Sequence, residues 1–450
     1  MAFTSSAITR KQNIAVIGSG IAGMSAAWLL SHRHDVTMFE KGDRLGGHSN
    51  TVTVETSLGP TPVDTGFIVF NEATYPNLIA LFHHLAVATR PSDMSFGVSL
   101  RNGRTEYSSV DASAFLAGGR NLASPRFWAM ALDLLRFYRQ APDDLAVADA
   151  EGMSLGEYLM RGGYGAAFQN DHLLPQAAAI WSASVGDVRD YPARAFVRFF
   201  ENHGLLKLKG RPAWRTVEGG SQSYVAKLTE PFADRARLNA TVVSVRRDGA
   251  GVTIRTKDGR SDRFDAVVIA AHADSALAML EDPTARECDL LGAFRYTKNR
   301  AVLHTDAALM PRRRQGWASW NYVGDSPQAG CIVTYWMNKL QRIESREQLL
   351  LTLNPRTPPK EGSVLYEKEY EHPLFDGAAL RAQRALWSLQ GVNNTWYCGA
   401  HFGAGFHEDG LQAGLAVAEQ LGGVRRPWSV ADESGRISLG PPPKAAALAA

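Results

Sequence analysis

Short runs of apolar residues predict buried strands of a parallel sheet. Residues 14–17 (IAVI) form one run and residues 36–39 form a second, and a segment rich in alanine and leucine separates them. Residues 264–272 (FDAVVIAAH) continue the same pattern much later in the chain. Strands that are buried on both faces show continuous apolar runs, whereas half-buried strands alternate. The order predicts a strand, helix and strand unit whose chain returns to the same sheet after a long insertion.

The insertion follows other periodicities. Residues 51–54 and 61–69 alternate and predict a hairpin, and residues 154–208 have a helical pattern. Three segments rich in aromatic residues predict strands of a second sheet, namely 296–305, 316–322 and 330–337. Aromatic strands usually form core, and lining an apolar cavity is the alternative.

One predicted helix in the insertion, residues 126–139, is amphipathic. Its apolar face carries Trp128, Ala131, Leu132, Leu135 and Tyr138. Packing of this face on the core of its own domain is the first interpretation, and contact with a membrane or a lipid entrance is the alternative. Residues 310–317 (MPRRRQGW) offer the same choice, between a solvated loop and the surface of an anionic membrane.

A glycine-rich turn directly follows the first predicted strand. Its glycines have the G-x-G-x-x-G spacing, and an acidic residue ends the second strand about twenty residues on. The glycines allow a tight turn and a close approach of the backbone to a diphosphate, which the helix N-terminus attracts. The acid accepts the ribose hydroxyls of an adenosine and disfavours NADP. The predicted contacts are Gly18, Gly20, Ile21, Ala22, Gly23 and Glu40.

The next residues resemble a known extension of this motif. Residues 40–48 (EKGDRLGGH) resemble the E-x-x-x-R-x-G-G pattern of the flavin amine oxidase and phytoene desaturase superfamily. In that superfamily the arginine and the paired glycines surround the diphosphate and flavin of FAD. The resemblance therefore implies FAD in preference to NAD. Non-covalent binding is the default expectation, with Cys398 and His48 as the conceivable points of attachment. It adds as cofactor contacts Lys41, Arg44, Gly46, Gly47 and His48.

The same superfamily implies cofactor contacts elsewhere in the chain. Its hairpin brings a glycine and its neighbour to the flavin, although the neighbour also suits an ordinary strand that ends in a turn. Another strand passes the adenine, and a last strand leads to a helix whose N-terminus faces the cofactor. The residues implied are Gly66, Phe67, Val243, Gly399, Asp409, Gly410 and Leu411. This chain has Ala400 where the superfamily has an aspartate, and Glu408 or Asp409 is expected to replace that acid.

Three stretches resemble one branch of the superfamily. They are residues 199–206 (FFENHGLL), 214–221 (WRTVEGGS) and 398–415 (CGAHFGAGFHEDGLQAGL). This branch contains bacterial FAD-dependent oxidoreductases associated with cyclopropane, methylated and furan fatty-acid synthesis, and the flavoprotein domain of plant cyclopropane-fatty-acid synthases. The resemblance implies oxidation of an unsaturated or methylated fatty-acyl chain, of the desaturase type, in a membrane phospholipid. It also implies a fatty-acid methyltransferase as partner.

The implied reaction needs a base and a dry slot. Removing hydrogen from an allylic carbon requires a hydride acceptor, which is the flavin N5, a base for the second proton, and an apolar channel that aligns the chain. The candidate bases are His407, Glu408 and His203, with Glu201 beside the last. Each has a structural alternative: the first two orient the cofactor helix, and His203 is a buried structural histidine.

Composition narrows the classes of partner and the cellular compartment that are expected for this protein. A net charge of +3 over 48 basic and 45 acidic residues gives no polyanion signal, so a nucleic acid is not expected. The three cysteines lack metal-ligand or redox spacing, which predicts no metal site and a reduced, cytoplasmic protein. Residues 1–12 lack the apolar core of a signal peptide, and no apolar run is long enough to span a bilayer. Peripheral contact with the inner face of the membrane stays open.

Two other functions remain. A flavin amine oxidase would want acidic or aromatic-cage residues around a soluble amine, and the basic segments of the insertion argue mildly against it. A flavoprotein without redox activity would instead serve a lipid methyltransferase, since a cofactor site establishes binding and not turnover.

The elements together predict an α/β fold in two interleaved domains. A Rossmann-type FAD-binding domain is expected to comprise residues 1–74, 212–290 and 386–425. An α+β substrate domain with a mixed or antiparallel sheet and a helical cap is expected to comprise residues 75–211 and 291–385. Residues 426–450 are expected to form a C-terminal tail.

Overall fold

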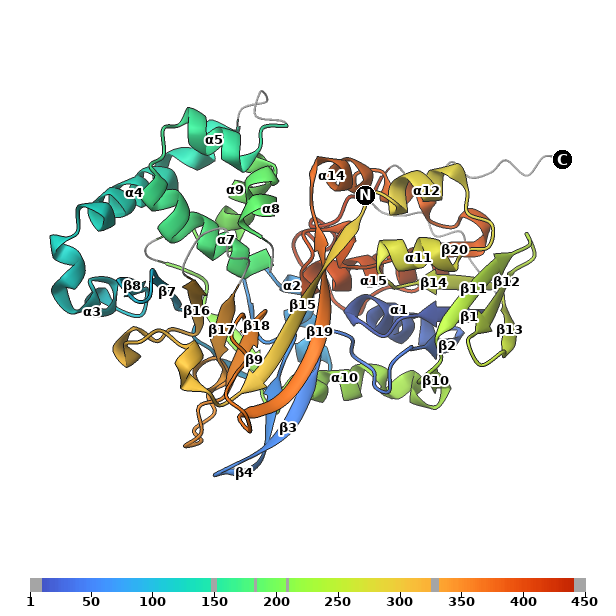
Figure 1. The fold of residues 1–450 in the computed structure, drawn as a ribbon. Helices are drawn as coiled ribbons and strands as arrows, with labels where there is room; N and C mark the ends of the chain where they lie inside the picture. The colour runs from blue at the N-terminus through green and yellow to red at the C-terminus, as the bar shows by residue number, and fades with distance from the viewer. Residues whose placement is uncertain (1–9, 147–151, 182–183, 208–209, 325–331, 441–450) are drawn as a thin grey trace.

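The structure is a computed structural model that describes residues 10–146, 152–181, 184–207, 210–324 and 332–440. Figure 1 shows a parallel sheet with its helices at one end of the molecule, a group of helices at the other, and long twisted strands between them. Both the N-terminal (blue) and C-terminal (red) parts of the chain lie at the first end. This arrangement confirms the predicted α/β class and the return of the chain to its first sheet.

The parallel sheet has five strands in the order β10-β2-β1-β14-β20. Every neighbouring pair runs parallel, and Ala15 of β1 lies opposite Val267 of β14. The apolar runs predicted as strands are these buried strands, since four of the five β1 residues are buried. The strands are β1 (Asn13–Ile17), β2 (Asp35–Phe39), β10 (Ala236–Arg237), β14 (Ala266–Ile269) and β20 (Thr395–Tyr397).

Two helices of this part pack closely against each other. Helix α1 (Ile21–Ser31) follows β1, and α15 (His407–Gly422) follows β20. A Cβ atom on Gly414 would lie 2.1 Å from the carbonyl oxygen of Ala22, and one on Gly410 would lie 2.9 Å from Cγ2 of Ile21. Glycine at these two positions lets the helices touch near their first turns. Both helix N-termini therefore lie close together at the carboxyl end of the parallel strands.

A seven-stranded mixed sheet forms the middle of the molecule, as the fold class predicted. Its order is β19-β15-β18-β17-β16-β7-β8, and all neighbours are antiparallel except β16 and β7. The strands are β7 (Phe96–Leu100), β8 (Thr105–Ser108), β15 (Arg295–His304), β16 (Trp320–Gly324), β17 (Val333–Trp336), β18 (Leu350–Leu353) and β19 (Val364–Leu374).

The helical cap lies beyond this sheet (Figure 1). Its helices are α4 (Pro125–Ala146), α5 (Leu155–Arg161), α6 (Ala166–Phe168), α7 (Leu174–Trp181), α8 (Val185–Asp190) and α9 (Ala193–Asn202). In α4 the buried face carries Phe127, Met130, Leu134 and Phe137. The face predicted to pack on the core adjoins this one: its Ala131 and Tyr138 are partly buried against the core, and its Trp128, Leu132 and Leu135 are 43%, 66% and 48% exposed. The expectation is therefore wrong for Trp128, Leu132 and Leu135, because the apolar surface of α4 is wider than the side that the rest of the protein covers.

Smaller elements complete the chain. The short sheets contain β3 (Thr51–Thr56) and β4 (Gly59–Asp64), then β5 (Phe70–Asn71), β6 (Thr89–Pro91) and β9 (Trp214–Val217), then β11 (Val242–Arg247), β12 (Val252–Thr256) and β13 (Ser261–Phe264). The other helices are α2 (Pro76–His84), α3 (Ala112–Phe115), α10 (Gln222–Thr229), α11 (Ala273–Met279), α12 (Ala285–Leu291), α13 (Met337–Leu340) and α14 (Gly377–Gln383). Across the described ranges, none of the helices combines the length and apolar character needed to cross a bilayer.

Residues 424–440 pack against the body of the protein, so the expectation of a tail from residue 426 is wrong as far as residue 440. Arg426 is buried and forms an ion pair with Glu419 of α15. Trp428 stacks on Trp28 of α1, with ring centroids 5.8 Å apart. Residues 441–450 lie outside the described residues.

Candidate functional site

The glycine turn after β1 is held by its contacts with the neighbouring backbone. Gly18 has φ +98°, and a Cβ atom there would lie 2.6 Å from the carbonyl oxygen of Ala270. A Cβ on Gly23 would lie 1.9 Å from the carbonyl oxygen of Gly18. The first position needs glycine for its left-handed conformation and the second for helix packing. Both are as the motif predicted.

Gly20 differs from its neighbours because the space beside it is open. A Cβ atom on Gly20 would meet no atom within 4 Å. Gly20 is also the residue that precedes α1, and neither a capping side chain nor an acidic residue occupies the first turn of that helix. The amide groups at this helix end thus face a space that a ligand can enter. An anion is favoured there by the helix dipole.

A second glycine turn closes against the first. The Gly46 N–H donates to the carbonyl oxygen of Ser19 at 3.0 Å, and a Cβ on Gly47 would lie 2.9 Å from Cα of Gly20. The guanidinium of Arg44 donates to the carbonyl oxygens of Leu45, Gly47 and Ser49. Arg44 therefore shapes the loop that presents these glycines.

Glu40 lies at the end of β2, where the motif places a ribose acceptor. Its carboxylate accepts hydrogen bonds from the Ser19 N–H at 3.0 Å and from the Gly42 N–H at 2.8 Å. The backbone N–H of Ala240 donates to the Glu40 carbonyl at 2.8 Å, so the chain that leads into β11 passes beside this acid. Val243 follows three residues later and is 44% exposed. The adenine contact expected of Val243 stays a prediction.

The first turn of α15 contains two acids, and within the described residues neither caps the amide groups of the helix itself. The Asp409 carboxylate accepts a hydrogen bond from the Phe406 N–H at 2.7 Å and from Nε of Arg436 at 2.5 Å. Asp409 is fully buried. Its carboxylate is therefore already bound within the protein, and only the backbone of Asp409 is left to contact a ligand. Gly410 and Leu411 follow in the same turn, against α1.

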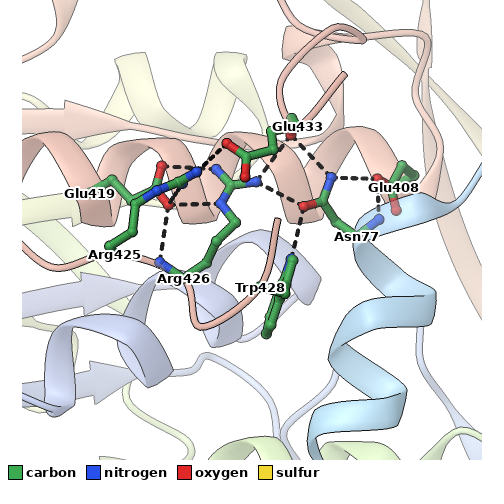
Figure 2. Close-up of polar contacts among 7 residues, drawn as sticks. All are labelled: Asn77, Glu408, Glu419, Arg425, Arg426, Trp428 and Glu433. Atoms are coloured by element: carbon green, nitrogen blue, oxygen red, sulfur yellow. Dashed lines mark hydrogen bonds and ion pairs between the residues drawn. The ribbon is translucent and has the colours of Figure 1, made fainter. Parts of the chain in front are cut away.

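Glu408 points away from the helix end toward α2. Its carboxylate accepts hydrogen bonds from the Asn77 N–H and the Leu78 N–H, both at 3.0 Å. The Asn77 side-chain amide and Nε2 of Gln412 also donate to it, each at 2.9 Å. Figure 2 shows Asn77 between Glu408 and the C-terminal segment, where it accepts from Arg426 and Trp428. The expectation that Glu408 serves as a base finds no support, because both of its oxygens hold the first turn of α2.

His407 remains a candidate base, because its side chain does not hold a neighbouring helix in the way that Glu408 does. Its ring stacks on Phe67, with centroids 3.8 Å apart and planes 10° apart, and its Nε2 lies 2.7 Å from the Tyr224 hydroxyl. The Tyr224 hydroxyl also bonds the Ser49 hydroxyl. Burial lowers the pKa of His407 to about 3, so the imidazole is neutral at physiological pH. The structure brings Phe67 and His407 together as two faces of one site.

His203 lies in the cap, one residue after α9, and reaches α15 through aromatic rings. It stacks on Phe199 with centroids 3.9 Å apart and lies 5.6 Å from the ring of Phe406, which precedes His407. Its Nδ1 bonds the Phe199 carbonyl at 2.9 Å, and its buried Nε2 has no partner within the described residues. Burial lowers its pKa to about 3. Glu201 is exposed on the neighbouring turn and is not part of this contact.

The remaining predicted positions border the same region. A Cβ on Gly66 would lie 2.1 Å from the carbonyl oxygen of His48, which also accepts from the Phe67 N–H at 2.7 Å. Burial lowers the pKa of His48 well below its usual value, and its Nε2 lacks a partner among the described residues. Gly399 is extended and lies against the ring of His401. Lys41 is exposed at the outer edge.

A comparison with known protein families identifies this architecture. The model of the flavin-containing amine oxidoreductases matches residues 21–308, which is more than half of the chain. The chain belongs to this family. The cofactor is therefore FAD, as the residues after Glu40 implied.

Individual relatives share the fold at low identity. A protein of Mycobacterium tuberculosis provisionally named flavin-containing monoamine oxidase AofH is 28% identical over 280 residues, which cover 60% of this chain and 59% of that protein. The chain thus spans about three fifths of the length of the curated relatives it matches.

Solved structures extend the likeness to most of the chain. Putrescine oxidase bound to putrescine has a TM-score of 0.65 at 15% identity, covering 92% of this chain and 99% of that one. A CLA-producing fatty acid isomerase from P. acnes has a TM-score of 0.65 at 16% identity, covering 91% and 97%. Cyclohexylamine oxidase from Brevibacterium oxydans has a TM-score of 0.64 at 17% identity, covering 92% and 100%. At these identities the likeness shows the fold alone.

The residues of this chain fit FAD. The open space at Gly20 lies where the diphosphate of a dinucleotide meets the helix N-terminus, and Glu40 lies where its ribose does. The unpartnered, buried Nε2 of His48 lies in the loop of the second glycine turn. A non-covalent link stays a prediction.

Sequence reasoning missed two residues of the site. Tyr224, on α10, is fully buried and links Ser49 to His407. Arg436 binds Asp409 and the Thr74 carbonyl, and so joins α15 to the loop before α2. No local pattern marks either one, because each acts on residues far away in the sequence.

Proposed function

We propose that this protein is an FAD-dependent oxidoreductase that oxidises an unsaturated or methylated fatty-acyl chain, of the kind found in membrane phospholipids. The observation that carries the proposal is that both acids next to His407 in the sequence are engaged within the protein and are not free to bind an ammonium ion. Phe67 covers one face of the ring, and the acids that follow His407 in the sequence are bound to α2 and to Arg436. Aromatic rings suit an alkyl chain and can also form a cage for an ammonium ion, so the engagement of both acids is what favours the alkyl chain, which needs no carboxylate.

An aromatic path supports the same substrate class. Trp181 lies 4.7 Å from Phe199, and Phe199 lies 4.8 Å from Phe406, measured between ring centroids. Phe406 directly precedes His407, so aromatic rings continue from the helical cap to the candidate base. Such a wall favours an apolar chain and excludes water from the reacting carbon.

His407 has the hydrogen-bonding arrangement of a base. When bound, FAD supplies the two-electron acceptor for a hydride. A neutral imidazole accepts a proton at Nδ1 when Nε2 carries the hydrogen and donates it to the Tyr224 oxygen. The Tyr224 hydroxyl then donates to Ser49, so Tyr224 is a positioning residue that fixes the ring and its tautomer.

The test is an anaerobic absorbance titration of the purified protein at the oxidised-flavin band. Phospholipid vesicles with unsaturated or methylated acyl chains should bleach the band and yield a conjugated or further desaturated chain. His407→Gln should keep the FAD spectrum and slow bleaching by about 100-fold. Tyr224→Phe should slow it less and shift its pH dependence.

The other functions predict different results. Bleaching by soluble amines without bleaching by lipid would replace the proposal with an amine oxidase. A flavin that stays oxidised with both would favour a non-redox partner of a lipid methyltransferase. An unchanged rate in His407→Gln would remove His407 from the reaction.

A further inference from the structure

A polar cavity of about 150 Å³ lies far from the glycine turns, at the start of α4. It is bordered by the β7–β8 hairpin, the segment before α4, the first turn of α4 and Arg313. Figure 1 shows β7, β8, α3 and α4 gathered at the outer end of the cap side. Its basic lining residues are Arg101, Arg104, Arg120, Arg126 and Arg313. This set is called the arginine pocket below.

The positive charge of the arginine pocket is not balanced by the protein. Asp171 is the acidic lining residue, and it binds both Arg101 and Arg126, at 2.9 and 2.7 Å. Arg313 lies 3.6 Å from the buried Glu106. Within the residues that the structure describes, the exposed guanidinium groups of Arg104 and Arg120 have no ion-pair or hydrogen-bond partner. A cavity several times the volume of a water molecule, with this excess of guanidinium groups, suits a phosphate.

An exposed apolar surface begins directly beside the arginine pocket. Leu122 lies between Arg120 and Ser124, which both line the pocket, and its carbonyl accepts a hydrogen bond from Nε1 of Trp128 at 3.0 Å. Leu132 and Leu135 continue from Trp128 along one side of α4, at the spacing of successive helical turns. These four residues, Leu122, Trp128, Leu132 and Leu135, form the exposed face of α4.

We propose that the arginine pocket and the exposed face of α4 together bind the surface of an anionic phospholipid bilayer, with a headgroup phosphate in the pocket. Charge complementarity selects this occupant, since cytoplasmic leaflets are anionic. A soluble phosphate would fill the pocket and leave the leucines in water. A bilayer covers both, with the tryptophan at the level of the headgroups and the leucines among the upper acyl carbons.

The inference rests on the proposed function only for its purpose, which is to bring the protein to a substrate that stays in the membrane. Binding itself needs no oxidation. It can therefore be measured on vesicles whose saturated chains are not substrates, so that failure to bind and failure to oxidise are separate results.

The experiment is cosedimentation of the FAD-loaded protein with dimyristoyl vesicles of phosphatidylglycerol or of phosphatidylcholine. Binding should be stronger to phosphatidylglycerol and should weaken as salt rises from 0.1 to 0.5 M. Arg104→Gln combined with Arg120→Gln should weaken binding to phosphatidylglycerol by about 25-fold, at roughly fivefold per arginine. Leu132→Ser combined with Leu135→Ser should weaken binding to a similar degree and leave the salt dependence unchanged.

Matched controls separate this surface from general charge and apolar content. Arg246→Gln with Arg260→Gln removes the same charge from the β11–β13 sheet, and Leu58→Ser removes an exposed leucine from the β3–β4 hairpin. Both should bind vesicles like the unaltered protein. Equal losses in controls and test variants would overturn the proposal, as would no binding to phosphatidylglycerol. Binding of inorganic phosphate that vesicles do not displace would also overturn it, because the pocket would then be a site for a free anion.

Discussion

The two helix ends that meet at the parallel sheet differ in the side chains of their first turns. The first turn of α1 offers bare backbone, since Gly20 has open space beside it and no side chain caps the helix. Within the described residues no side chain caps α15 either, but two acids of its first turn are bound: Asp409 accepts from the Phe406 N–H and Arg436, and Glu408 holds α2. The first end has room for a diphosphate, and the bound acids of the second end fix the position of the turn that carries His407.

The largest effect is expected for a substitution of Gly23, the glycine that packs α1 against the first glycine turn. Gly23→Val places a branched side chain where a Cβ would lie 1.9 Å from the backbone oxygen of Gly18. Neither backbone segment can yield without breaking the contact of α1 with the sheet, so a loss above about 3 kcal/mol in the free energy of unfolding is expected. Urea unfolding followed by circular dichroism measures it. A variant as stable as the unaltered protein would contradict this packing.

Gly20→Val should separate binding from folding at the same helix end. The side chain enters open space, and Gly20 has an ordinary φ of −64°, so the folded state is kept. The valine occupies the approach of the diphosphate to the helix N-terminus, and FAD affinity should fall by about 100-fold or more. The flavin absorbance of the purified protein and FAD titration of the apoprotein measure this. Retention of FAD would show that the diphosphate lies elsewhere.

Much of the site around the first turn of α1 could be predicted from the sequence, because its geometry depends on the backbone of residues that are close together in the chain. The spacing of Gly18, Gly20 and Gly23 reports a turn geometry, and the runs in β1 and β14 report burial on two faces. The choice of covered face on α4 could not be read, since both sides of that helix carry large apolar residues. Its orientation depends on which other helices reach it.

The contacts of the first turn of α15 could not be predicted from the sequence, for a different reason. Glu408 is bound to Asn77 across 331 positions of sequence, and the Tyr224 contact with His407 spans 183. No pattern within α15 distinguishes an acid that caps a distant helix from one that takes a proton. The packing of residues 424–440 could not be predicted either, because their partners also lie far away in the sequence. Their composition alone looks like that of a solvated segment.

A substitution at Glu408 tests whether the second end is structural. Glu408→Ala leaves the buried N–H groups of Asn77 and Leu78 without an acceptor, which should cost about 3 kcal/mol of unfolding free energy. Glu408→Gln keeps an acceptor oxygen and should cost less. Urea unfolding measures both, with the exposed Glu361→Gln as the control. Full stability together with slow flavin reduction would restore Glu408 as a base.

The smallest effect concerns His203 and appears only as a function of pH. The folded pKa of about 3 lies below the ordinary value of 6.5, so between these values the unfolded chain binds a proton that the folded protein does not. Above pH 6.5 the neutral ring makes its full contribution to the free energy of unfolding. As the pH is lowered toward 3, that free energy falls by about 1.4 kcal/mol per pH unit. His203→Phe keeps the stack on Phe199 and Phe406 and removes this dependence. Relative to the unaltered protein, it should gain about 2 kcal/mol between pH 7 and pH 5 in urea unfolding. The exposed His83→Gln is the control and should gain much less. An equal difference in stability at both pH values would show that His203 takes up its proton in the folded state, which would make it available as an acid or base in the reaction.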